Sequence, residues 1–269
     1  MDIWKLRISV PKGTEELLPE DVYELANGGI ILEEKDYDLL NLIFYTKNPE
    51  TLLSLLEEKV QVIEYSLSRE EPKDYEKIVK NLYKPVKIGD IYVVCPWHKV
   101  KSPTKSIVIE PGMAFGTGRH ESTKIMMLLM SKTNFKSKDV ADLGCGSAIL
   151  SIYASILGAK EILGVDIDGN ATLCAKKNVD LNRLSNVRIE KMDLKDVQGE
   201  FDVVLANLDL YTFMSHMEHV KRLARRGGTL IISGILGREK KRFLKLTENL
   251  HLKEELRIGS WVGFRFKKP

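Results

Sequence analysis

The chain has 269 residues, of which 43% are apolar and 29% charged, and its formal net charge is +3. This much apolar side chain excludes a disordered chain, and no apolar run approaches the roughly 20 residues that cross a bilayer. The first residues lack the basic and then apolar order of a signal peptide. Three scattered cysteines contain no Cys-x-x-Cys pair, so we expect a cytoplasmic globular protein with reduced thiols.

The first 66 residues follow the order strand, helix, strand, strand, helix, strand. The predicted strands are 4–10, 30–34, 39–46 and 61–67, and the predicted helices are 15–26 and 49–56. Asn48 and Pro49 favour the start of the second helix, as its N-cap and its first helical residue. This order predicts a ferredoxin-like α+β domain over residues 1–66.

This leading domain is acidic. Residues 1–66 contain six Lys or Arg and fourteen Asp or Glu, a net charge of −8, whereas residues 67–269 carry +11. The acidic side chains either solvate the surface of a small domain or attract a basic partner, because unlike charges speed association. The domain contains no His or Cys. We therefore expect it to recognise a substrate rather than to perform chemistry.

A charged stretch at 69–73 predicts a domain boundary, and residues 67–95 form the predicted linker, with a short helix at 75–82 and a strand at 91–95. From 96 to 269, helical patterns alternate with short apolar strands. Those strands are expected at 140–143, 162–165, 187–190, 203–206 and 229–233, followed by a hairpin of 252–258 and 261–266. Continuous apolar strands are typical of a parallel sheet covered on both faces. The expected fold class is α/β, a Rossmann-like domain with an antiparallel C-terminal hairpin, after the small α+β domain.

A glycine-rich turn is the strongest local signal. Gly144 and Gly146 follow an apolar strand and precede the predicted helix 149–157, whose N-terminus offers free amide donors to an anionic group. About twenty residues on, Asp166 ends the next strand, where an acidic side chain accepts the hydroxyls of a ribose. We predict that these three residues bind a ribose-bearing cofactor. The full Gly-x-Gly-x-x-Gly pattern of a dinucleotide site is not met, because Ile149 follows Ala148.

Two motifs carry a family resemblance. Asp142-Leu143-Gly144-Cys145-Gly146 resembles motif one of the class I S-adenosylmethionine methyltransferases. The run at 110–123, Glu-Pro-Gly-Met-Ala-Phe-Gly-Thr-Gly-Arg-His-Glu-Ser-Thr, is similar to the Pro-Gly-x-Ala-Phe-Gly-Thr-Gly-x-His loop of the ribosomal protein L11 methyltransferases, the PrmA family. Further matches follow in order at Asn207, at Ser233-Gly234 and at Trp261-Val262, and the small leading domain also fits this family.

The resemblance implies a function and a set of site residues. It implies an S-adenosylmethionine-dependent protein methyltransferase acting on lysine side chains and the α-amine of ribosomal protein L11. Thr123, Gly144, Asp166 and Asn207 would line the cofactor site, with Asn207 also aligning the amine and Phe115 covering the methyl donor. No metal is implied. We expect a monomer whose catalysis needs neither a membrane nor a nucleic acid.

Several alternatives stay open at this point. Phe115 either covers the methyl donor or anchors its loop in the core, and Asp168 and Asp193 are weaker candidates for cofactor contacts. His216 and His219 lie three residues apart on a predicted helix, either as a pair of metal ligands or as exposed histidines. The basic run 238–242 is either a solvated helix face or an RNA contact. Two residues depart from the family pattern: Ala148 replaces the third glycine of motif one, and Asp209 stands where an apolar or small residue is common.

The rival functions are a related methyltransferase acting on another protein or on nucleic acid, a binding protein that has lost catalysis, and a nicotinamide dehydrogenase. Nucleic-acid enzymes commonly carry Asn/Asp-Pro-Pro-Tyr after the fourth strand, whereas this chain has Asn207-Leu208-Asp209-Leu210. The glycine turn lacks the room that a dinucleotide pyrophosphate needs.

Overall fold

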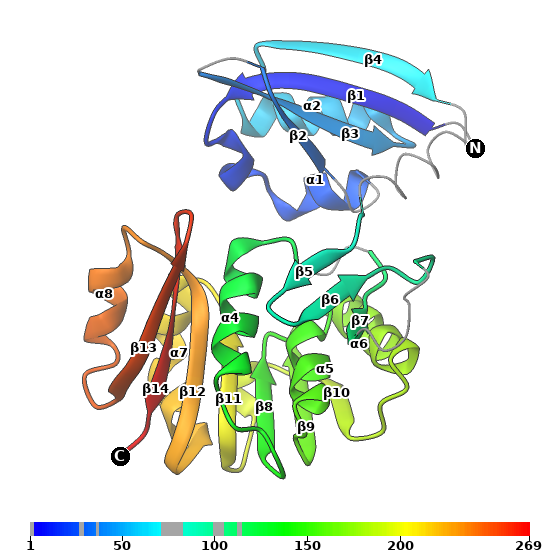
Figure 1. Cartoon of the computed structure of the whole chain (residues 1–269). Helices are drawn as coiled ribbons and strands as arrows, with labels where there is room; N and C mark the ends of the chain where they lie inside the picture. Colours follow the sequence, from blue (N-terminus) through cyan, green and yellow to red (C-terminus); the bar gives the residue numbers. More distant parts are fainter. Residues whose placement is uncertain (1–2, 27–29, 36–37, 71–82, 99–104, 112–114) are drawn as a thin grey trace. The chain divides into compact units, whose positions relative to one another are not determined.

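The computed structural model describes residues 3–26, 30–35, 38–70, 83–98, 105–111 and 115–269 (Figure 1). The described residues up to Lys84 form one compact unit, and those of 85–110 and 115–269 form a second. The expected boundary after residue 66 falls inside a strand that continues to Glu70, and part of the expected linker belongs to the second unit. The predicted helix at 75–82 lies outside the described residues.

The first unit is a four-stranded antiparallel sheet with two α-helices. Its elements are β1 (Ile3–Pro11), η1 (Thr14–Leu17), α1 (Glu20–Leu25), β2 (Ile30–Glu34), β3 (Leu39–Thr46), α2 (Pro49–Lys59) and β4 (Glu64–Glu70). The strand order is β2-β3-β1-β4, and apolar residues of β1 and β3 share a core with α1 and α2. The predicted ferredoxin-like order is therefore confirmed.

Three local details of this unit differ from the prediction. The expected helix at 15–26 is divided, because Pro19 lacks a backbone N–H and becomes the N-cap of α1. Asn48 does occupy the N-cap position of α2, but its side chain makes no capping hydrogen bond. The last strand begins at Glu64 rather than at residue 61.

The second unit contains a seven-stranded sheet in the order β10-β9-β8-β11-β12-β14-β13. The strands are β8 (Asp139–Leu143), β9 (Glu161–Asp166), β10 (Val187–Lys191), β11 (Phe201–Asn207), β12 (Ala224–Leu236), β13 (His251–Ile258) and β14 (Trp261–Lys267). The first five pair in parallel, and β14 pairs antiparallel with both β12 and β13. The expected parallel sheet with an antiparallel C-terminal hairpin is confirmed.

Helices cover both faces of this sheet (Figure 1). One core contains apolar residues of α4 (Glu121–Ser131), α5 (Ile149–Ile156) and α6 (Gly169–Leu181), and the other contains those of α7 (Leu210–Leu223) and α8 (Lys240–Lys245). Both cores are rich in Ile, Val, Leu, Met and Phe, which explains why the central strands are apolar on both sides. None of the described helices is long and apolar enough to cross a membrane.

A small third sheet packs on α4 and α5. It consists of β5 (Val86–Ile88), β6 (Ile91–Val94) and β7 (Ser106–Val108), with β6 in the centre. Only β6 was expected from the sequence, and it was expected in the linker. The sheet matters for the site because β7 leads into the segment that precedes Phe115.

Candidate functional site

The parallel register brings three predicted site residues to one edge of the sheet. Leu143 pairs with Val165 and with Ala206 on its two sides. The next residue on each strand is therefore Gly144, Asp166 or Asn207, side by side at the carboxyl edge. Neighbouring strands lie about 4.8 Å apart, so the three positions fit within the length of one small ligand. Ligands of open parallel sheets bind at this edge.

The glycine turn is a close-packed cradle. Gly144 and Gly146 both adopt positive φ, 68° and 53°, which glycine tolerates best. A Cβ at Gly146 would lie 2.6 Å from the carbonyl oxygen of Phe115, and one at Gly144 would lie 2.5 Å from Leu208 Cδ2. Any side chain at either position would therefore displace the turn or its cover. Ala148 also adopts positive φ, which explains why the family pattern has glycine there.

Asp166 is oriented by two backbone groups. Its Oδ2 accepts a hydrogen bond from Gly146 N at 2.9 Å, and its Oδ1 accepts one from Asp168 N at 3.1 Å. A carboxylate has about four acceptor positions, so each oxygen retains a lone pair for a ligand hydroxyl. The side chain of Asp168, in contrast, caps α6 by accepting from Asn170 N and Ala171 N. Asp166 is therefore the acidic residue available to a ribose.

Three buried polar atoms beside this cradle have no hydrogen-bond partner among the described residues. They are Thr123 Oγ1, Asp142 Oδ1 and Asn207 Oδ1. An unsatisfied buried polar group costs about 1–3 kcal/mol, so a ligand that bonds to these three atoms would recover that free energy. Together with the glycine cradle and the free lone pairs of Asp166, they fit a ligand with hydroxyl and amine groups. S-adenosylmethionine has both.

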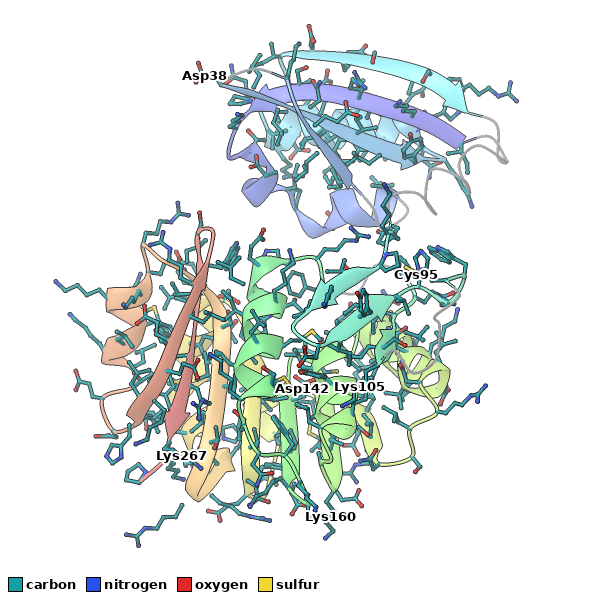
Figure 2. The ribbon with its side chains drawn as sticks, in the orientation of Figure 1. Asp38, Cys95, Lys105, Asp142, Lys160 and Lys267 are labelled. Carbon is teal, nitrogen blue, oxygen red and sulfur yellow. The ribbon has the colours of Figure 1, made fainter. Side chains whose placement is uncertain are left out.

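Asp142, which is labelled in Figure 2, is fully buried. Burial raises the pKa of its carboxyl to about 6, although the hydroxyl of Ser151 donates to Oδ2 at 2.6 Å and lowers it. The negative charge of Asp166 raises the pKa further. Burial also raises the pKa of Cys145, so this thiol stays protonated and unreactive at neutral pH.

The segment from Phe115 to His120 lies against the turn through Ser147. Ser147 N donates to the Phe115 carbonyl at 2.9 Å, and Ser147 Oγ donates to the Gly116 carbonyl at 2.6 Å. The Phe115 side chain is 54% exposed, so it is not anchored in the core. Its ring lies edge-on to His120, which in turn contacts Trp261 edge-on. Burial lowers the pKa of His120, which favours a neutral ring that caps α4 by accepting from Ser122 N.

The weaker candidates from the sequence have no evident part in the cradle. Asp193 caps η2 (Leu194–Asp196) and pairs with Lys195, as expected of a surface turn. Asp209 caps α7 by accepting from Tyr211 N and from Thr212 N. His216 and His219 do lie on α7, but no group of three possible metal ligands occurs among the described residues.

Three neighbours of the cradle were not singled out from the sequence. Ser147 joins the turn to the Phe115 segment, and Leu208 covers Gly144. Ile167, directly after Asp166, is 67% exposed, which leaves its apolar surface accessible to the flat face of a base. An apolar residue after the acidic strand end was a signal in the sequence for this last position.

Known proteins provide an independent comparison. A family model described as "Ribosomal protein L11 methyltransferase (PrmA)" matches residues 8–269. The ribosomal protein L11 methyltransferase of Thermoanaerobacter pseudethanolicus is 37% identical over 72% of this chain, which spans 65% of that protein. The one from Caldicellulosiruptor bescii is 31% identical, with 98% of each chain covered. A crystal structure of ribosomal protein L11 methylase from Lactobacillus delbrueckii subsp. bulgaricus is 28% identical, with a TM-score of 0.65 over 70% of this chain and 100% of that one.

Proposed function

Because the chain belongs to the ribosomal protein L11 methyltransferase family, we propose that it transfers methyl groups from S-adenosylmethionine to amines of ribosomal protein L11. The amines are lysine side chains and the α-amine. The observation that carries the proposal is the buried Oδ1 of Asn207, which lacks a partner among the described residues and stands next to Gly144 at the carboxyl edge. A cytoplasmic location and a monomeric state stay predictions.

In this proposal the cradle holds the cofactor. Asp166 accepts the ribose hydroxyls with the lone pairs that Gly146 N and Asp168 N leave open. The backbone of Gly144 and Gly146 approaches the methionine end, since neither residue has a side chain in the way. Thr123 Oγ1, which is buried without a partner among the described residues, supplies a further hydrogen bond. When bound, S-adenosylmethionine supplies a methyl group on a positively charged sulfur, which needs no further activation.

The chain then has to orient the reacting amine and remove water from around it. Asn207 Oδ1 accepts an amine hydrogen and so directs the nitrogen lone pair toward the methyl group. Alignment of this kind supplies much of the acceleration in a transfer between two bound groups. The ring of Phe115 covers the site and excludes water, which favours the neutral amine over the charged one; for a lysine side chain the unperturbed pKa is about 10.4. No side chain in the cradle is assigned as general base.

The first unit is proposed to recognise the protein substrate. Its residues 1–66 carry a net charge of −8, which suits a basic partner, and ribosomal proteins are typically basic. Its ferredoxin-like sheet contains none of the proposed cofactor residues, which all lie at or beyond Phe115.

The direct test is to incubate the chain with methyl-labelled S-adenosylmethionine and total ribosomal protein and RNA. Mass spectrometry should find the label on amines of L11. Asn207→Ala should reduce this labelling about tenfold or more, since the amine loses its acceptor. Label in RNA alone would favour the rival nucleic-acid methyltransferase, and no label anywhere, with the cofactor bound, would favour a protein without catalysis.

A further inference from the structure

Two asparagines at the C-terminal end of α6 bind the chain that leads to Phe115. Asn178 lies in the last turn of α6, and Asn182, four residues on, is its C-cap. The Asn182 carboxamide pairs with β7 as a neighbouring strand would, since its Oδ1 accepts from Val108 N at 2.9 Å and its Nδ2 donates to Val108 O at 2.7 Å. Asn178 Oδ1 accepts from Glu110 N at 2.9 Å. The two side chains together extend the edge of β7.

Asn178 differs from Asn182 in two respects. Its Nδ2 donates to the carbonyl oxygen of Ser147 in the glycine turn at 3.0 Å, and the side chain is fully buried. Ser147 in turn donates to the carbonyls of Phe115 and Gly116. Asn178 thus binds the chain at Glu110, before Phe115, and Ser147 binds the chain at Phe115 and Gly116. A single carboxamide connects the cofactor turn to the segment that carries the proposed cover.

We propose that Asn178 is a positioning residue for methyl transfer, one that sets the glycine turn and the Phe115 backbone in register. This role rests on the proposed cofactor site, and it gives Asn178 no contact with the cofactor or the substrate. Its carboxamide is suited to the task because it accepts from one backbone and donates to the other, which no apolar residue of the same size can do. Because the side chain is buried, replacing either hydrogen bond by one to water is costly.

The control is Asn182, whose substitution removes two hydrogen bonds to Val108, two residues before Glu110, and leaves the glycine turn untouched. Asn178→Leu and Asn182→Leu each replace a carboxamide by an apolar side chain of similar size. In both variants the ion pair of Lys177 with Glu110 still joins α6 to the segment that follows β7. A merely structural role predicts equal effects of the two variants, whereas a positioning role predicts effects on cofactor and turnover from Asn178 alone.

The experiment measures three quantities for wild type and both variants. They are the Kd for S-adenosylhomocysteine by calorimetry, kcat and KM for L11, and the free energy of unfolding in urea. We expect Asn178→Leu to raise the Kd and to lower kcat, each about tenfold, with KM for L11 unchanged, and Asn182→Leu to alter each less than about threefold at a comparable loss of stability. Asn178→Asp, which keeps the acceptor for Glu110 N but not the donor to Ser147, should behave as Asn178→Leu does if the latter does not fold.

The outcomes separate the two levels of the proposal. Equal changes in Kd and kcat for the Asn178 and Asn182 variants, or an Asn178 variant with unchanged Kd and kcat, would overturn the positioning role alone. A wild-type chain that does not bind S-adenosylhomocysteine would overturn the proposed cofactor site, and the role of Asn178 with it.

Discussion

The carboxylate of Asp166 combines a structural and a ligand-binding task, and the two can be separated by substitution. Asp166→Ala should weaken the binding of S-adenosylmethionine by about 1–3 kcal/mol, because the ribose hydroxyls lose a charged acceptor. Calorimetry measures this directly. Asp168→Ala is the matched control, since Asp168 caps α6; it should cost about 1 kcal/mol of unfolding free energy and leave the affinity unchanged. Unchanged affinity in a folded Asp166→Ala variant would reject the role of this residue.

Asp142 should make stability depend on pH. Burial raises the pKa of its carboxyl from 3.8 to about 6, so the folded chain holds this proton more tightly than the unfolded chain does. Between about pH 4 and pH 6, rising pH therefore lowers the free energy of unfolding of the wild type through this group. Asp142→Asn removes the effect. The stability of the variant minus that of the wild type should rise by about 1–3 kcal/mol from pH 4 to pH 7.5 in urea titrations. A difference that is flat in pH contradicts the raised pKa.

Substitution of Phe115 tests whether its ring covers the proposed cofactor site. The side chain is largely exposed, so Phe115→Ala should change the free energy of unfolding by no more than about 0.5 kcal/mol, whereas turnover should fall clearly. Leu252→Ala provides the comparison, because Leu252 is an exposed apolar residue at the start of β13, at the opposite edge of the sheet. It should affect neither quantity. If Phe115→Ala lowers stability while turnover persists, the ring has a structural role instead.

At the scale of elements, the start of α7 depends on Asp209. Burial raises the pKa of its carboxyl, but hydrogen bonds from Thr212 and from Tyr211 N outweigh it, and the net pKa is lowered. Asp209→Ala should therefore cost about 0.5–2 kcal/mol of unfolding free energy, and Asp209→Ser, another good N-cap, should recover most of it. The contribution is present at neutral pH and is lost as pH falls through the lowered pKa. If Asp209→Ser is as unstable as Asp209→Ala, capping is not what Asp209 contributes.

The elements that were predicted well share a local cause. Central strands, the two-helix leading domain and the C-terminal hairpin follow from apolar runs and turn residues, which act over a few neighbours in the chain. The prediction of helices and strands was wrong where a single residue or a partner distant in the sequence determines the local structure. Pro19 divides a helix by removing one N–H, and β5 and β7 are three-residue strands that exist because β6 lies between them.

At the scale of the whole molecule, the two compact units lead to a prediction about substrate recognition. Removal of residues 1–84 should leave the second unit able to bind S-adenosylmethionine, because the seven-stranded sheet and every proposed cofactor residue are retained. Methylation of L11 should become slow, since the acidic unit is lost. Rising salt should also slow the intact chain, because charges further apart than about 8 Å are screened at physiological ionic strength.

Calorimetry and initial rates at several salt concentrations check this prediction. Unaltered methylation of L11 by the shortened chain would show that residues 1–84 do not serve recognition. A shortened chain that is folded but does not bind the cofactor would show that the first unit supports the site itself.

The sequence by itself determined the family, the order of the main strands and helices, and the row of Gly144, Asp166 and Asn207, because motifs and apolar periodicity are properties of short stretches of chain. Tertiary structure alone decided between Asp166 and Asp168, since both are acidic and only the hydrogen bonds reveal which one caps a helix. It also decided that Phe115 is exposed, and that Asn178 joins the glycine turn to Glu110, ahead of Phe115 in the chain. These two contacts of Asn178 join residues more than thirty positions apart, and no local pattern specifies the partner of a buried amide.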